Sequence, residues 1–119
     1  MIIAKHFEFE AAHSLPNEEC YGACSNLHGH TYRLTIEIEG DINKYGWVMN
    51  FKDLKHIVKS KVIDVLDHSN INDIIAIPTA ENMIIWIEKQ IKDDFTQYNT
   101  KLKSIILYET SNSYAKIEY

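Results

Sequence analysis

The sequence predicts an α+β fold, in which a four-stranded antiparallel sheet carries two helices on one face, in the order strand, strand, helix, helix, strand, strand. Apolar and polar residues alternate near both ends of the chain, a pattern typical of half-buried strands. Between residues 51 and 91 the apolar residues instead recur every three or four positions, as in amphipathic helices. No repeat or linker divides the sequence, so we expect a single domain over 1–119.

Two strands are predicted in the N-terminal third, over residues 2–13 and 29–40. Successive side chains of a strand point to opposite faces, so residues of equal parity share a face. In the first strand the apolar face is the row Phe7, Phe9, Ala11 and His13. In the second it is the row His28, His30, Tyr32, Leu34, Ile36 and Ile38. Each strand therefore carries histidine at the end of its buried face.

The two predicted helices follow a polar loop around Gly46. The first begins after Asn50, which is a favourable N-cap, and its apolar residues follow helical spacing: Phe51, Leu54, Ile57, Val58, Val62, Val65 and Leu66. The second begins after Pro78, is capped by Thr79, and buries Ala80, Met83, Ile84, Ile87 and Ile91.

The chain returns to strands over residues 103–110 and 113–119. In the first of these, Glu109 shares a face with Ile105 and Leu107. Burying a carboxylate in such a row is costly unless a charged or hydrogen-bonding partner compensates. Either the strand frays and Glu109 meets solvent, or Glu109 serves a site.

The composition excludes some classes of function. The net charge of −5 argues against nonspecific nucleic-acid binding, whose affinity comes mostly from basic residues at phosphates. No apolar run approaches the length that spans a membrane, and the strand-like start differs from a signal peptide. We therefore expect a cytoplasmic protein with no nucleic-acid or membrane partner.

The run from Cys24 to His30 places a thiol before two histidines that share one strand face. With His13 from the neighbouring strand, His28 and His30 would supply three neutral imidazoles, the ligand set of a catalytic zinc site with one open position. The alternative is that the three are separate core histidines with satisfied hydrogen bonds.

The two cysteines leave further alternatives. Cys20 and Cys24 could form a disulfide, although the chain resembles an intracellular protein with its own core. Cys24 could also be a fourth zinc ligand, because structural zinc sites often mix cysteine and histidine. On that alternative the chain is a non-catalytic zinc-binding module.

Asp67 and His68 are adjacent in the loop that follows the first helix. Histidine is the side chain best suited to proton transfer near neutral pH, and a neighbouring carboxylate raises its basicity and orients its ring. The pair is therefore a candidate acid–base group.

Several of these motifs together resemble the 6-pyruvoyltetrahydropterin synthase and 6-carboxytetrahydropterin synthase (QueD) family. The resemblance covers nearly the whole chain and rests on residues 7–13, 24–30, 46–55, 66–68, 78–81 and 108–110. It implies the tunnelling fold, or T-fold. It also implies Zn²⁺ held by His13, His28 and His30, and trimers paired into a homo-hexamer with active sites at subunit boundaries.

The same resemblance assigns the catalytic residues. It makes Cys24 the thiol that accepts protons, Asp67 and His68 its relay partners, and Glu109 the carboxylate that anchors the pterin. A carboxylate suits that role because it accepts paired hydrogen bonds from a guanidine-like ring edge.

Spacing favours the QueD branch, because Cys24 stands only four residues before His28, and because Trp47 follows Gly46. Met49-Asn50, in contrast, resembles the biopterin branch. The reaction implied is conversion of 7,8-dihydroneopterin triphosphate to 6-carboxy-5,6,7,8-tetrahydropterin with release of triphosphate and acetaldehyde, in queuosine and deazapurine biosynthesis. The alternative is 6-pyruvoyltetrahydropterin synthesis by the same residues.

Overall fold

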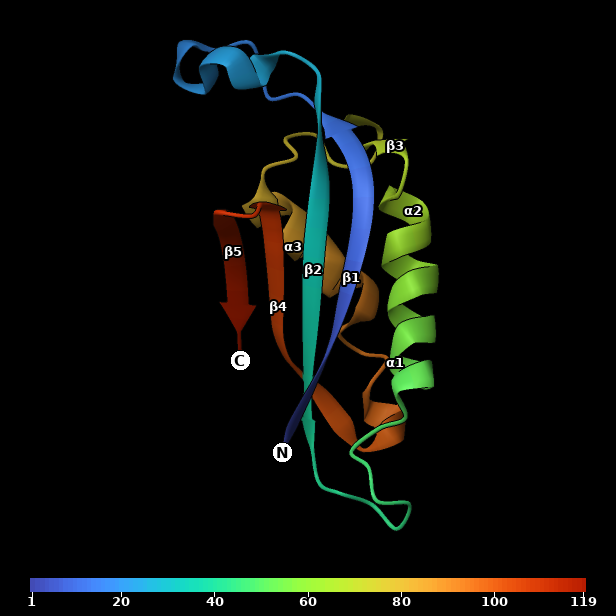
Figure 1. Ribbon diagram of the computed structural model, residues 1–119. Coiled ribbons are helices and arrows are strands. Elements are labelled where there is room, and N and C mark those ends of the chain that lie inside the picture. Colours follow the sequence, from blue (N-terminus) through green and yellow to red (C-terminus); the bar gives the residue numbers. More distant parts are fainter.

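One sheet of five strands forms the centre of the computed structural model, which describes residues 1–119 (Figure 1). Its strand order is β3-β1-β2-β4-β5. The strands are β1 (Ile2–His13), β2 (His28–Gly40), β3 (Ser69–Asn70), β4 (Thr100–Thr110) and β5 (Ser113–Glu118). The four long strands pair antiparallel, as the alternating patterns predict.

The prediction of a purely antiparallel four-stranded sheet was wrong, because β3 pairs with β1 in parallel. The reason lies at the free edge of β1, where both backbone groups of Glu10 point away from β2. The Glu10 N–H donates to the Asp67 carboxylate at 2.9 Å, and the Glu10 carbonyl accepts from the His68 N–H at 2.6 Å. The next two residues continue along this edge as β3.

Two helical stretches connect the strands. The first is continuous and consists of α1 (Phe51–Val58), the π-helical turn η2 (Lys59–Ile63) and α2 (Asp64–Leu66); the second is α3 (Ala80–Ile91). Both predicted caps are confirmed, since the Asn50 side chain accepts from the Lys52 N–H and the Thr79 side chain from the Asn82 N–H. Three short 3₁₀-helices complete the chain: η1 (Glu19–Ser25), η3 (Ile71–Asp73) and η4 (Thr96–Tyr98).

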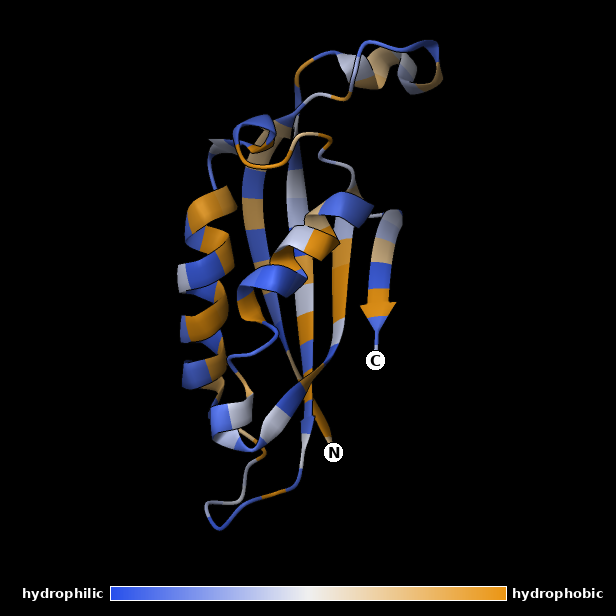
Figure 2. Ribbon diagram, turned by 180° about the vertical axis from the view of Figure 1, so that it is seen from behind, coloured by the Kyte–Doolittle hydropathy of each residue, from blue (hydrophilic) through white to orange (hydrophobic).

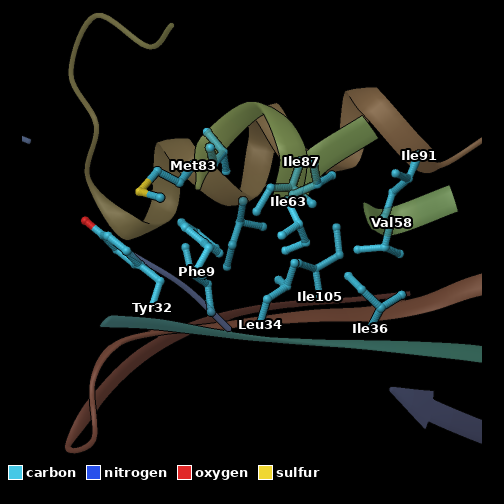
Figure 3. Close-up of a cluster of buried hydrophobic side chains, with 14 of the residues drawn as sticks. Phe9, Tyr32, Leu34, Ile36, Val58, Ile63, Met83, Ile87, Ile91 and Ile105 are labelled. Atoms are coloured by element: carbon cyan, nitrogen blue, oxygen red, sulfur yellow. The ribbon is translucent and has the colours of Figure 1, made fainter. Parts of the chain in front are cut away.

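The helices lie on one face of the sheet, as predicted. Helix α3 is behind the sheet in Figure 1 and in front of it in Figure 2, where its ribbon and that of α1–α2 show mixed hydrophobic and hydrophilic residues. Between the helices and the sheet lies one cluster of buried apolar side chains. Figure 3 labels ten of them: Phe9, Tyr32, Leu34, Ile36, Val58, Ile63, Met83, Ile87, Ile91 and Ile105.

The long hairpin of β1 and β2 sets the position of the histidines. Its register pairs His13 with His28 and Ala11 with His30. The hairpin thus ends in three histidines on the face that also holds the core. No helix in the chain is both long and apolar enough to cross a membrane.

Candidate metal centre and active site

His13, His28 and His30 form one cluster at the end of the β1–β2 hairpin. One ring nitrogen from each lies within 4.8 Å of those from the other two. The three rings meet edge-on, with centroids 4.6 to 5.0 Å apart. His13 is buried, and the other two are partly buried. The sequence predicted this grouping, because strand parity and antiparallel register together determine it.

Backbone carbonyls determine which ring nitrogens carry protons. A carbonyl oxygen can only accept, so Nδ1–H of His13 donates to Pro78 at 2.8 Å and Nδ1–H of His28 donates to Asn26 at 2.6 Å. In the neutral rings both Nε2 atoms therefore carry lone pairs, and they lie 3.0 Å apart. Two lone pairs at this distance repel each other unless a cation or proton lies near both.

His30 adds a third unsatisfied nitrogen. Its Nε2 is buried and has no hydrogen-bond partner. Burial lowers the pKa of His30 below its usual value, against the opposing effect of the Glu109 carboxylate, and the neighbouring His13 and His28 lower it further. The ring is therefore held neutral, as a metal ligand must be.

The donor set fits a zinc ion. Ligand nitrogens around one tetrahedral zinc, with bonds of about 2.0–2.1 Å, lie about 3.3 Å apart, close to the 3.0 Å between Nε2 of His13 and Nε2 of His28. A cation would also satisfy Nε2 of His30. Two of the rings are also oriented from outside the cluster, because the Pro78 and Asn26 carbonyls accept hydrogen bonds from their Nδ1–H groups.

Glu109 lies beside this cluster. Its Oε1 is 3.5 Å from Nε2 of His30, and its side chain is 32% exposed. It ends the row of β4 whose preceding members, Ile105 and Leu107, are fully buried. The carboxylate that the sequence placed on a buried row thus lies beside the histidines. It is partly exposed to solvent, so it can accept hydrogen bonds from a bound molecule.

Tyr32 lies two residues beyond His30 on the same strand face. Burial, and secondarily the negative charge of Glu109, raise the pKa of its hydroxyl above the usual value. Tyr32 therefore stays a neutral phenol throughout the physiological pH range.

Asn72 fixes the chain just after His13, a role that the sequence did not reveal. Its side-chain amide donates to the Ser14 carbonyl at 2.8 Å, and its carbonyl accepts from the Ser14 N–H at 2.8 Å. Pro78 was predicted only to start a helix, although its carbonyl also orients the ring of His13. Neither contact has a local signal, because the partners are 58 and 65 residues apart.

Asp67 and His68 form a pair beside β1, at the edge along which β3 follows. Nδ1 of His68 lies 3.0 Å from Oδ2 of Asp67, and the His68 side chain is 82% exposed. The hydrogen bond from the Glu10 N–H, followed by the effect of His68, holds the pKa of Asp67 below its usual value. An open cavity of about 410 Å³ is lined by His68 and Ser69 together with hairpin residues that include Glu10 and His30.

Cys24 is not part of this cluster within the chain. It lies on η1, in an arm that stands away from the sheet (Figure 1), and its side chain is exposed. The arm includes Gly22 with φ of 52°, and no residue of η1 is buried. One backbone hydrogen bond, from the Leu15 N–H to the Cys24 carbonyl at 2.8 Å, ties the two sides of the arm together. Cys20 is likewise a free, exposed thiol.

Several known proteins are similar to this chain in sequence or in fold. Residues 2–119 match the family described as 6-pyruvoyl tetrahydropterin synthase. A dihydroneopterin monophosphate aldolase of Pyrococcus furiosus is 39% identical over 111 residues, covering 93% of this chain and 91% of that protein. A 6-carboxy-5,6,7,8-tetrahydropterin synthase of Haemophilus influenzae is 34% identical over 142 residues, covering 98% and 97%.

Solved structures share the fold. A 6-pyruvoyl tetrahydropterin synthase of Caenorhabditis elegans superimposes with a TM-score of 0.88, covering 100% of this chain and 95% of that one at 24% identity. The predicted T-fold is therefore confirmed. The sheet differs from the predicted one in its fifth strand, β3.

Proposed function

The chain belongs to the 6-pyruvoyl tetrahydropterin synthase family of enzymes, and from this membership we propose that it is a zinc-dependent 6-carboxy-5,6,7,8-tetrahydropterin synthase. It would convert 7,8-dihydroneopterin triphosphate to the carboxypterin and release triphosphate and acetaldehyde. The proposed pathway is queuosine and deazapurine biosynthesis, in the cytoplasm. One observation carries the proposal: the ring nitrogens of three histidines converge next to Glu109, and one of them, Nε2 of His30, is buried without a hydrogen-bond partner.

His13, His28 and His30 would hold the zinc in this proposal. When bound, the ion supplies a Lewis acid that makes the side-chain hydroxyls of a substrate more acidic. The protein contributes the orientation of two rings, through the Pro78 and Asn26 carbonyls, and the burial that lowers the pKa of His30.

Glu109 would bind the pterin ring. Its carboxylate can accept two hydrogen bonds from the amino and ring N–H groups at the guanidine-like edge, which is a strong, directional pairing. Its position 3.5 Å from His30 would set the pterin side chain near the zinc ligands.

Cys24, Asp67 and His68 would move protons. The thiolate of Cys24 would remove protons from the substrate side chain, and His68, oriented by Asp67 at 3.0 Å, would relay them. The wide exposure of His68 leaves its ring free to approach a ligand.

Assembly would complete this site. Two features are consistent with surfaces that a neighbouring subunit covers: η1 contains no buried residue, and the His68 side chain is exposed. We propose the homo-hexamer of paired trimers that the resemblance implies. A single domain over 1–119 is proposed on the basis of one continuous core cluster.

A second candidate function has its own support, since the 39% identical relative of Pyrococcus furiosus is named an aldolase of dihydroneopterin monophosphate. The same zinc, carboxylate and acid–base groups could catalyse carbon–carbon cleavage without loss of triphosphate. The 6-pyruvoyl synthase reaction, for which the family is named, is the third outcome to test.

One experiment separates the three reactions. Purified, zinc-loaded protein is incubated in parallel with dihydroneopterin triphosphate and dihydroneopterin monophosphate, and products are identified by mass spectrometry. We expect 6-carboxytetrahydropterin and acetaldehyde from the triphosphate. A pyruvoyl product without acetaldehyde, or cleavage of the monophosphate alone, would replace the proposed function.

A further inference from the structure

Tyr32 packs against two of the three clustered histidines. It is fully buried and stacks on Phe9 across the β1–β2 pair, with ring centroids 5.0 Å apart. Its ring meets those of His13 and His30 edge-on, at centroid distances of 6.0 and 5.5 Å. In Figure 3 its hydroxyl points away from the aliphatic cluster. The ring therefore packs in the core, whereas the hydroxyl lies at the histidine cluster.

The hydroxyl has one hydrogen-bond partner, Nδ1 of His13, at 3.3 Å. That Nδ1–H already donates to the Pro78 carbonyl at 2.8 Å, so the phenol oxygen is the second acceptor of a shared N–H. Two acceptors on Nδ1–H restrict the rotation of the ring about its long axis. They also push electron density toward Nε2, the nitrogen that faces His28.

This contact gains strength when a cation binds. An imidazole coordinated through Nε2 carries more positive charge, and its Nδ1–H becomes a stronger donor. The Tyr32 oxygen therefore stabilises the metal-bound ring more than the free ring. Such outer contacts of metal-binding histidines change metal affinity without touching the metal.

We propose that Tyr32 is a positioning residue of the metal centre, which orients His13 and raises its zinc affinity through the shared Nδ1–H. The inference rests on the proposed zinc site. The Tyr32 ring packs in the core and the hydroxyl contacts His13, so a substitution can remove the hydroxyl and leave the ring in place.

The test uses Tyr32→Phe, which keeps the ring and removes only the hydroxyl. We expect the zinc Kd, measured by competition with a chromogenic chelator, to rise about tenfold, at the low end of the effect of outer-shell contacts. The urea midpoint of the metal-free protein should stay unchanged, because the packing remains. Tyr32→Leu should weaken zinc binding further and also lower that midpoint.

Tyr98→Phe is the matched control, because Tyr98 packs against the same core from η4, outside the histidine cluster. Its zinc Kd should equal that of the wild type. The zinc concentration that gives half-maximal activity should rise in Tyr32→Phe by the same factor as the zinc Kd. An unchanged zinc Kd in Tyr32→Phe would overturn the positioning role, whereas failure of the wild type to bind zinc would overturn the proposed function itself.

Discussion

Asn72 offers a quantitative test of how the chain holds His13. Its amide makes two hydrogen bonds of 2.8 Å to the backbone of Ser14, the residue after His13, in a partly buried setting. Each such bond contributes about 1 kcal/mol net, so Asn72→Ala should lower the free energy of unfolding by about 2 kcal/mol. With a urea m-value of about 2 kcal/mol/M, the midpoint should fall by about 1 M.

The assay is urea unfolding of metal-free protein in chelator, at one fixed protein concentration so that assembly does not change the apparent stability. Asn112→Ala is the control, because Asn112 lies in the exposed β4–β5 turn, where its backbone N–H, and not its side chain, makes a hydrogen bond. It should change the free energy of unfolding by less than about 0.5 kcal/mol. A midpoint for Asn72→Ala equal to that of Asn112→Ala would refute the view that Asn72 fixes this end of β1.

Three further predictions concern the site. Cys24→Ala should lose turnover but keep one zinc per chain by elemental analysis. The control Cys20→Ala should keep both its zinc and its turnover. Loss of zinc from Cys24→Ala would instead make Cys24 a ligand. Glu109→Ala should weaken pterin binding about 10- to 100-fold by calorimetry with the fold intact, as expected for lost charge-assisted hydrogen bonds; unchanged affinity would place Glu109 outside the pterin site. Folding lowers the pKa of His30. As the pH falls below about 6.5, His30 is therefore protonated in the unfolded chain before it is protonated in the folded chain. The metal-free protein should therefore lose stability between about pH 6.5 and the lower folded pKa, by at most about 1.4 kcal/mol per pH unit from this group; a urea-midpoint slope that persists in His30→Gln would contradict this.

Periodicity was enough to predict the histidine cluster. Strand parity placed His13, His28 and His30 on buried faces, and the antiparallel pairing of a hairpin then set His13 opposite His28. The same alternation identified Glu109 as a carboxylate on a buried row, and the structure gives it a neighbour in His30. The grouping of the three histidines was predictable because it depends on local geometry that a regular strand repeats.

Elements without periodicity could not be predicted in this way. Strand β3 has two residues, too few for any alternation to appear. His68 turns the chain with φ of 59°, a conformation that the sequence would signal with glycine or asparagine rather than histidine. The arm around Cys24 buries no residue of η1, so no apolar stripe indicates where it packs. The exposure of Cys24, outside the histidine cluster of its own chain, is the main feature that the spacing of Cys24 and His28 did not reveal.

The central claim, that His13, His28 and His30 hold the zinc on which pterin chemistry depends, can be tested in one measurement. Metal-free wild-type protein and the same protein reloaded to one zinc per chain are given dihydroneopterin triphosphate, and acetaldehyde and 6-carboxytetrahydropterin are quantified. We predict no product from the metal-free protein and full recovery on reloading. Equal turnover by the two samples would contradict the account.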